Sequence, residues 1–289
     1  MIPPRAALSA GGAPSVWRHT RKGDKFVTVI IDLTPLRAGR GPARLLDMVE
    51  GRSKKAFKDW LSQQDAAWRD RIEVVAMDGF LPRKREVPPG FKTAAKEELP
   101  DAVEVMDPFH VVQLAGDALD HARQRVQQET TGHRGRSGDP LYGVRRTLHT
   151  GMDLLTDKQR TRLEAVFAQD RHAQVEASWS VYQKIVGAYR NPDRAAGRDQ
   201  LAHLIDAISR EVPSVLAEIT TLGRTLKRRA ADVLAYFERP HTSNGPTEAL
   251  NGRLEHLRGS ALGFRNLTNY IARSLLEAGG FRPQLHPQS

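Results

Sequence analysis

Residues 72–78 read Ile-Glu-Val-Val-Ala-Met-Asp, and residues 103–110 read Val-Glu-Val-Met-Asp-Pro-Phe-His. Each stretch begins as a run of β-branched and apolar residues and then reaches an aspartate, which predicts two strands with Asp78 and Asp107 at their carboxyl ends. In an open α/β sheet this edge is where ligands and catalytic residues gather. Aspartates are also common in turns and helix caps, so neither residue indicates a function by itself.

Three further elements are predicted upstream of residue 72. Residues 25–33 and 43–49 favour strands, and residues 54–64 favour a helix with an apolar face. The order strand, strand, helix, strand, linker, strand predicts a mixed α/β fold. Prolines and basic residues fill residues 79–90, which predicts an exposed loop.

After His110 the apolar residues recur at the three-and-four spacing of helices. The predicted helices cover residues 111–128, 154–167, 174–189, 199–210 and 214–237, followed by a last helix that starts near Pro246 and bends at residues 259–263 before residues 266–276. The chain therefore combines an α/β part with a large all-α part.

Composition narrows the class of partner. The 289 residues hold 44 Lys+Arg against 34 Asp+Glu, a formal net charge of +10, which favours polyanions and above all nucleic acid. The absence of cysteine excludes disulfides, thiolate catalysis and cysteine zinc sites. No apolar run approaches the roughly 20 residues needed to cross a bilayer, so we expect no membrane partner and a cytoplasmic protein.

Basic residues cluster in four places, residues 18–25, 83–85, 123–136 and 227–229. Solvated surface explains many of them, but with this net charge we expect phosphate contacts as well. The candidate DNA-binding residues are Arg83, Lys84, Arg85, Lys227, Arg228 and Arg229.

Two other residues could take part in chemistry. His110 follows Asp107 by three positions and could bind a ligand, relay a proton or simply pack beside a helix cap. Glu248 lies in the first turn of a helix that begins at Pro246, and Asn251 follows it by one turn on the same face. A first-turn glutamate is also favoured by the helix dipole without any function.

Several motifs carry a family resemblance. They are 26–33 Phe-Val-Thr-Val-Ile-Ile-Asp-Leu, 46–52 Leu-Asp-Met-Val-Glu-Gly-Arg, 99–112 Leu-Pro-Asp-Ala-Val-Glu-Val-Met-Asp-Pro-Phe-His-Val-Val, 139–142 Asp-Pro-Leu-Tyr, 243–251 Ser-Asn-Gly-Pro-Thr-Glu-Ala-Leu-Asn and 263–266 Gly-Phe-Arg-Asn. With these motifs the chain resembles the ISL3 family of bacterial insertion-sequence transposases of the DDE type, over roughly residues 16–283.

The resemblance implies an RNase H-like α/β fold with a helical insertion before the last catalytic helix. The implied domains are a disordered end (1–14), the α/β part (15–114), the helical insertion (115–240), C-terminal helices that complete the α/β domain (241–283) and a tail (284–289). The implied activity is metal-dependent cleavage and transfer of DNA strands by a protein of the bacterial nucleoid that could form a homo-oligomer on DNA.

Residue by residue, Asp78 matches the second catalytic Asp of the family and Glu248 matches its last Glu. The resemblance makes these two carboxylates the ligands of two Mg²⁺ ions, so we expect them about 4 to 8 Å apart. Asp107, His110 and Asn251 are expected to border the same site.

The first catalytic Asp is where the chain departs from the family. Ala13 and Pro14 stand at that place, and neither can bind a metal, while Asp32 belongs to the next strand and is expected to be structural. The zinc ribbon and helix-turn-helix of the family are absent too. The chain is therefore interpreted as a truncated, defective transposase copy, or as a copy with a wrongly assigned start. A non-catalytic basic DNA-binding remnant is the alternative, and an RNase H-like nuclease would need a substitute carboxylate near Asp78.

Overall fold

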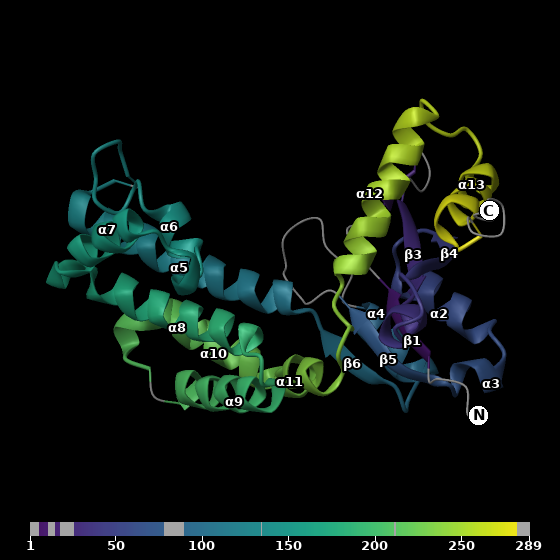
Figure 1. Ribbon diagram of the computed structural model, residues 1–289, viewed down its shortest axis with the longest axis horizontal. Coiled ribbons are helices and arrows are strands. Elements are labelled where there is room, and N and C mark those ends of the chain that lie inside the picture. The colour runs from purple at the N-terminus through teal and green to yellow at the C-terminus, as the bar shows by residue number, and fades with distance from the viewer. Residues whose placement is uncertain are drawn as a thin grey trace. The chain divides into compact units, whose positions relative to one another are not determined.

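The computed structural model of the protein describes residues 6–10, 15–17, 26–77, 90–133, 135–210 and 212–281. The chain forms two compact units. The first contains residues 1–107 and 239–289, and the second contains residues 108–238. The first is an α/β unit and the second is entirely helical in its described residues, with the elements labelled in Figure 1.

The described part of the α/β unit contains one six-stranded sheet. Its strands are β1 (Ala6–Ala10), β2 (Ser15–Val16), β3 (Phe26–Asp32), β4 (Arg44–Glu50), β5 (Ile72–Met77) and β6 (Val103–Met106). The main path runs β4-β3-β1-β5-β6, and β2 pairs with the start of β3. β3 is antiparallel to β1, β2 and β4, whereas β1, β5 and β6 are parallel, so the sheet is mixed as predicted.

Strand β1 corrects the expectation that residues 1–14 are a disordered end. Leu8 pairs with Asp32 of β3 on one side and with Val75 of β5 on the other, so β1 is an interior strand of the sheet. Its composition, Ala-Ala-Leu-Ser-Ala, has little intrinsic preference for a strand. Hydrogen bonds and burial from two neighbours override that weak local preference.

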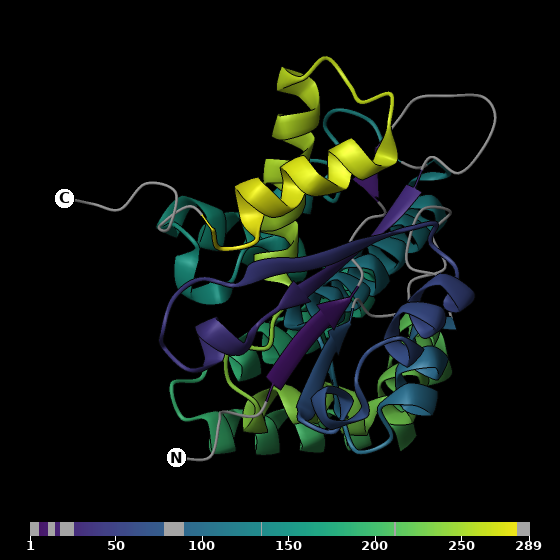
Figure 2. The same cartoon turned by 90° about the vertical axis from the view of Figure 1, so that its right-hand side faces the viewer.

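The helices of the α/β unit are α1 (Thr34–Arg37), α2 (Lys54–Ser62), α3 (Ala66–Arg69), α4 (Gly90–Glu98), α12 (Gly245–Ser260) and α13 (Leu267–Ala278). Apolar residues of α2 and α4, including Phe57 and Phe91, pack with Leu8 and Val75 into one buried core. Helix α4 was not predicted, because the sequence there was interpreted as a linker. Figure 2 shows this unit with its sheet at the centre.

Side chains alternate between the two faces of a strand, so Ser9 points to the face of the sheet opposite Leu8. Ser9 contacts α12, whereas Leu8 packs with α2 and α4. The last helices of the chain therefore cover the face that α2 and α4 leave open. This arrangement brings the start of α12 against the middle of the sheet.

The helical unit contains α5 (Pro108–Thr131), α6 (Arg145–His149), α7 (Asp157–Phe167), α8 (Ala173–Arg190), α9 (Arg194–Arg210), α10 (Ala217–Arg228) and α11 (Ala230–Glu238). Helices α5, α8, α9 and α10 pack around a buried core that includes Leu119, Ile185 and Leu226. The single helix expected over residues 214–237 is wrong. The segment is divided at Arg229 into α10 and α11. The buried residues on either side of the break, Leu226 and Val233, keep a helical spacing, so the apolar pattern does not reveal it.

Candidate functional site

Asp107 connects the end of β6 to the start of α12. It follows Met106, the last residue of β6, and only 4% of its surface is exposed. Its Oδ2 accepts a hydrogen bond from the backbone N–H of Asn244, at 3.0 Å. The first N–H groups of a helix have no partners inside the helix. A buried carboxylate here accepts a hydrogen bond from one of them, and its negative charge interacts favourably with the positive end of the helix dipole.

A second contact holds the same turn of α12. The hydroxyl of Ser9 in β1 donates to Oδ1 of Asn244 at 2.9 Å and lies 2.7 Å from Oγ1 of Thr247. These three polar residues are all buried, with 0% to 1% of their surfaces exposed. Two strands of the sheet therefore position the first turn of α12, the turn that carries Glu248.

The two faces of α12 agree with the predicted pattern. Leu250 and Leu254 are buried, whereas Glu248 is exposed. One turn after Glu248, Oδ1 of Asn251 is buried and has no hydrogen-bond partner in the described part of the chain. A buried acceptor without a donor is costly, and such an atom at the border of a site is suited to a bound water or ligand group. Further along, Glu255 pairs with Arg258.

Other predicted residues cannot be placed. Asp78, Arg83, Lys84 and Arg85 lie outside the described residues, so the convergence of Asp78 with Glu248 remains a prediction. Within the described ranges, no three His, Asp or Glu side chains come together in a group that could hold a metal ion. None of the helices searched there is both long and apolar enough to cross a membrane.

His110 belongs to the helical unit, in the first turn of α5. It is buried, with 7% of its surface exposed, and its ring lies edge-on to the ring of Phe109, with the centroids 5.7 Å apart. Asp107 is assigned to the other unit. The role of His110 at a shared site therefore also stays a prediction.

Asp32 is held in a structural position. Its Oδ1 accepts the backbone N–H of Thr34 at 2.8 Å, and its Oδ2 is 2.9 Å from Nη2 of Arg44. Asp32 pairs with Leu8, and Leu8 pairs with Val75. Asp32 is therefore in register with a residue two positions before Met77, the last residue of β5. Because both carboxylate oxygens have partners, Asp32 is a poor substitute for a missing metal ligand.

The predicted DNA-binding residues near residue 228 differ in their surroundings. Lys227 forms an ion pair with Asp206, and Arg229 lies 2.6 Å from Asp232. Arg228 is exposed. Ion pairs reduce the positive charge that Lys227 and Arg229 present to a polyanion. Arg228 is therefore the best candidate of the three for a contact with DNA.

The basic stretch 123–136 contains arginines with structural contacts. Arg123 is buried and donates to the carbonyl of Leu141 and to Gln127, while Arg125 pairs with Glu218 at 2.7 Å. Their guanidinium groups satisfy acceptors of the helical unit itself. A cluster of basic residues in the sequence therefore overstates the basic surface.

A second buried carboxylate lies in the helical unit. Asp120 on α5 is 6% exposed, and its Oδ2 is 2.8 Å from Nε of Arg145 and 3.3 Å from Nε2 of His149. Burial raises the pKa of Asp120, but the contacts with His149 and Arg145 outweigh burial and hold that pKa well below its usual range. Nothing in the local sequence pattern separates Asp120 from a solvated aspartate, so the sequence does not predict its role.

Sequence analysis also missed Ser9, Asn244 and Thr247. The sequence predicts the helix start near Pro246 but not the groups that hold it, because Ser9 precedes Asn244 by 235 positions. A polar residue in the middle of an apolar strand is the only local signal that Ser9 gives.

Comparisons with known proteins agree with one another. The sequence model of a family described as "Transposase", DDE_Tnp_ISL3, matches residues 18–274. A "Transposase for insertion sequence element IS1557" from Mycobacterium tuberculosis strain H37Rv is 24% identical over 296 residues, which cover 93% of this chain and 61% of that protein. Its counterpart from strain CDC 1551 gives the same values. The chain thus spans about three fifths of the length of these relatives.

Proposed function

Because the chain belongs to the ISL3 family of transposases, we propose that it forms the catalytic part of a DDE transposase, which cleaves and joins DNA strands at the ends of an insertion sequence. The observation that carries this proposal is the attachment of the first turn of α12 to the sheet by Asp107 and Ser9. That attachment supports a position for Glu248, the residue matching the last catalytic Glu, beside the carboxyl edge of the parallel strands.

The fold that we infer for the α/β unit is RNase H-like. Three antiparallel strands, β4, β3 and β1, followed by the parallel strands β5 and β6, support this inference. The chain leaves the α/β unit after Asp107 and returns at Arg239, which supports a helical insertion before the last catalytic helix.

We further propose Asp78 as the partner of Glu248. Asp78 follows Met77 in the chain as Asp107 follows Met106, and Met77 and Met106 are register neighbours in parallel strands. Residues that follow the last paired position of two neighbouring parallel strands lie at the same edge of the sheet. By this argument Asp78 belongs to the edge at which α12 begins.

The residues of this edge suit Mg²⁺, which prefers oxygen ligands such as carboxylates and waters. Asp78 and Glu248 would hold the ions, and the buried amide oxygen of Asn251, which lacks a donor, suits a water bound beside them. When bound, such ions activate the attacking hydroxyl and stabilise the leaving oxygen of the phosphoryl transfer. Asp107 and Ser9 contribute by orienting α12, not by contact with the reacting phosphate.

A second function is favoured by one specific observation. Ala13 and Pro14 stand where the resemblance expects the first catalytic carboxylate. Two ions held by Asp78 and Glu248 alone lack a bridging ligand, which weakens their binding and their positioning. The alternative is therefore a protein that binds DNA without cutting it.

Titration of Mn²⁺ followed by electron paramagnetic resonance tests the proposed site without requiring activity. The unmodified chain is expected to bind Mn²⁺ weakly, and Glu248→Gln is expected to reduce the affinity by at least about tenfold. Glu255→Gln, an exposed glutamate two turns later on the same helix, is the matched control and should bind as the unmodified chain does. Equal affinity of Glu248→Gln and the control would remove Glu248 from the site.

A further inference from the structure

We propose that the connection from α5 into the start of α6, residues 132–133 and 135–146, is a docking surface for the phosphate backbone of duplex DNA. This surface belongs to the helical unit, whereas Glu248 belongs to the α/β unit. This inference rests on the proposed function in that the partner is DNA. It assigns the contact to a defined part of the helical unit, and it names Arg136, Arg146 and Arg162 as the residues that make it.

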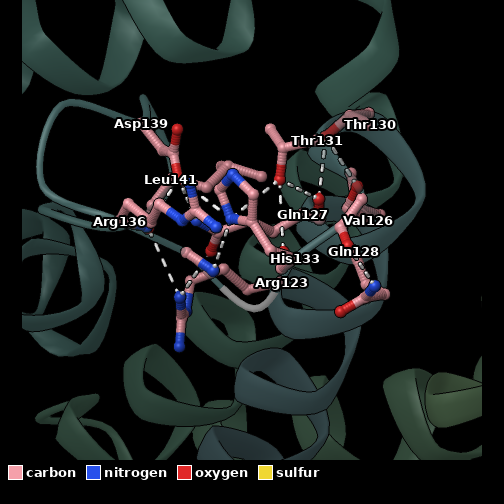
Figure 3. A network of polar contacts seen from close by, with 12 residues as sticks. Arg123, Val126, Gln127, Gln128, Thr130, Thr131, His133, Arg136, Asp139 and Leu141 are labelled. Carbon is pink, nitrogen blue, oxygen red and sulfur yellow. Dashed lines mark hydrogen bonds and ion pairs between the residues drawn. The ribbon is translucent and has the colours of Figure 1, made fainter.

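Polar groups that face the inside of this loop are satisfied within the loop (Figure 3). Oδ2 of Asp139 accepts the backbone N–H of Arg136 at 2.6 Å and lies 3.5 Å from Nδ1 of His133. Gln127 of α5 donates to the same Oδ2 at 3.4 Å. Asp139 is the only acidic residue between positions 131 and 149, so its charge is used in holding the loop together.

The base of the loop is attached to α5 by further hydrogen bonds. Gln128 donates to the carbonyl of Gly132 at 2.8 Å, and the buried Arg123 donates to the carbonyl of Leu141 at 3.4 Å. Gly135 has φ of 116°, and a Cβ there would collide with Gln127 and would be 2.7 Å from the ring of Tyr142. The loop is therefore a specific, internally bonded structure rather than a solvated connection.

Two exposed arginines of this surface have guanidinium groups that pair with no carboxylate of the described residues. Arg136 and Arg146 are exposed, and neither forms an ion pair with the described residues. Tyr142 lies between them in the sequence and is 51% exposed. Such an aromatic ring flanked by arginines can pack on the sugars of a nucleic-acid backbone while the arginines contact its phosphates.

A third arginine reaches this surface from α7. The guanidinium group of Arg162 lies so close to Gly143 that a Cβ at that position would collide with its Nη2. Gly143 directly follows Tyr142, so Arg162 joins the exposed side of the loop. Arg162 is also exposed and has no ion-pair partner in the described ranges.

Charge complementarity selects the partner. Three exposed arginines without a carboxylate partner in the described ranges suit phosphate groups, because each phosphate contact releases counterions and a preformed support costs little ordering entropy. An acidic segment of another protein is the competing partner. It would use the same charges but would not need the regular spacing of phosphates on a duplex.

The test uses the full chain and a labelled 30-base-pair duplex, with binding followed by fluorescence anisotropy between about 50 and 200 mM salt. The variant is Arg136→Ala, Arg146→Ala and Arg162→Ala combined. The matched control, Lys184→Ala, Arg210→Ala and Arg224→Ala, removes the same charge from exposed positions of α8, α9 and α10. Thermal unfolding of both variants checks that the fold is retained.

Loss of three phosphate contacts should lower affinity by at least about tenfold and reduce the slope of log K against log salt by about 2 to 3, whereas the control should change neither markedly. Equal losses in both variants, or no binding by the unmodified chain, would overturn the proposal. So would displacement of the duplex by poly-glutamate at matched charge. Mn²⁺ binding by the loop variant is a separate readout, so failure of the loop and failure of the metal site are distinguishable.

Discussion

The carboxylate of Asp107 and the backbone N–H of Asn244 are 137 positions apart in the sequence and 3.0 Å apart in the structure. The chain leaves the α/β unit immediately after Asp107 and returns to it at Arg239, five residues before Asn244. One hydrogen bond therefore ties the strand before the helical unit to the helix that follows it. This bond holds the start of the helix that carries Glu248, so we expect the position of Glu248 to depend on Asp107.

The first prediction concerns that bond. Asp107→Ala should lower the free energy of unfolding by about 1 to 3 kcal/mol, because it leaves a buried N–H without an acceptor. Asp107→Asn keeps an acceptor oxygen and should cost less. Mn²⁺ affinity should fall in the same order if Asp107 positions Glu248. Urea unfolding and Mn²⁺ titration measure the two effects, with Asp101→Ala at an exposed position as the control. If Asp107→Ala unfolds with the same free energy as the unmodified chain, the bond has no structural role.

The second prediction tests strand β1. Ser9→Ala and Thr247→Val each remove one side of a buried 2.7 Å contact, and each should cost about 1 kcal/mol. In a double-mutant cycle the two changes should couple by about 0.5 to 1 kcal/mol, since neighbours that share a contact are not additive. Additive effects would mean that β1 does not pack against α12 in solution.

Strands β3 to β6 and most helices were predictable, because β-branched runs and three-and-four apolar spacing report burial directly. Strand β1 was not, because Ala-Ala-Leu-Ser-Ala becomes a strand only through its pairing with Phe26–Asp32 and Ile72–Met77. The break at Arg229 was not predictable for a related reason. The apolar residues on both sides keep a helical spacing, so nothing local marks the end of α10.

The site divides in the same way. Glu248 at a helix start and Asp107 at a strand end were predicted from positions that local patterns define. Their connection was not, because it involves Asn244 and Ser9, which are distant in sequence and come together only when the sheet forms. Patterns report which residues are buried or capped, but not which distant group satisfies them.

The third prediction concerns pH and Asp120. The lowered pKa of Asp120 means that its carboxylate stabilises the fold above the unfolded pKa of about 4, and that this contribution is lost as pH falls below it. Asp120→Asn should therefore destabilise the chain at pH 7 by about 3 kcal/mol. The difference from the unmodified chain should narrow below about pH 4.

Urea unfolding at several pH values measures this difference. The control is Asp153→Asn, because Asp153 pairs with Arg190 at the surface with 65% of its side chain exposed, where ion pairs contribute at most about 1 kcal/mol. A constant difference between Asp120→Asn and the unmodified chain from pH 7 to pH 3 would contradict the assignment.

The fourth prediction separates two effects in the loop of residues 132–146. Gly138→Ala introduces a side chain at φ of 103° into open space, so it should cost only backbone strain, about 1 to 3 kcal/mol. Gly135→Ala adds a collision with Gln127 and Tyr142, so we expect a further cost of about 1 to 3 kcal/mol and weaker DNA binding. Equal costs for both variants would mean that the loop is not packed on Gln127.

The last prediction concerns catalysis. The unmodified chain should not cleave DNA with Mg²⁺, because Ala13 supplies no carboxylate to bridge the ions proposed at Asp78 and Glu248. A disordered end over residues 1–14, as expected from the sequence, would leave an aspartate at position 13 without a supporting strand. Strand β1, Ala6–Ala10, removes that obstacle, because the strand preceding Ala13 is paired on both sides.

We expect Ala13→Asp to raise Mn²⁺ affinity by about tenfold. Ala13→Asn introduces a side chain of the same size as aspartate but without its charge, and it should not raise the affinity. Plasmid nicking then shows whether improved ion binding restores chemistry, because nicking needs both ions in place. Equal Mn²⁺ affinity of the two variants would show that position 13 is not part of the proposed metal site. Cleavage by the unmodified chain that Asp78→Ala abolishes would instead require another ligand, and Asp32 is a weak candidate because Thr34 and Arg44 already occupy its oxygens.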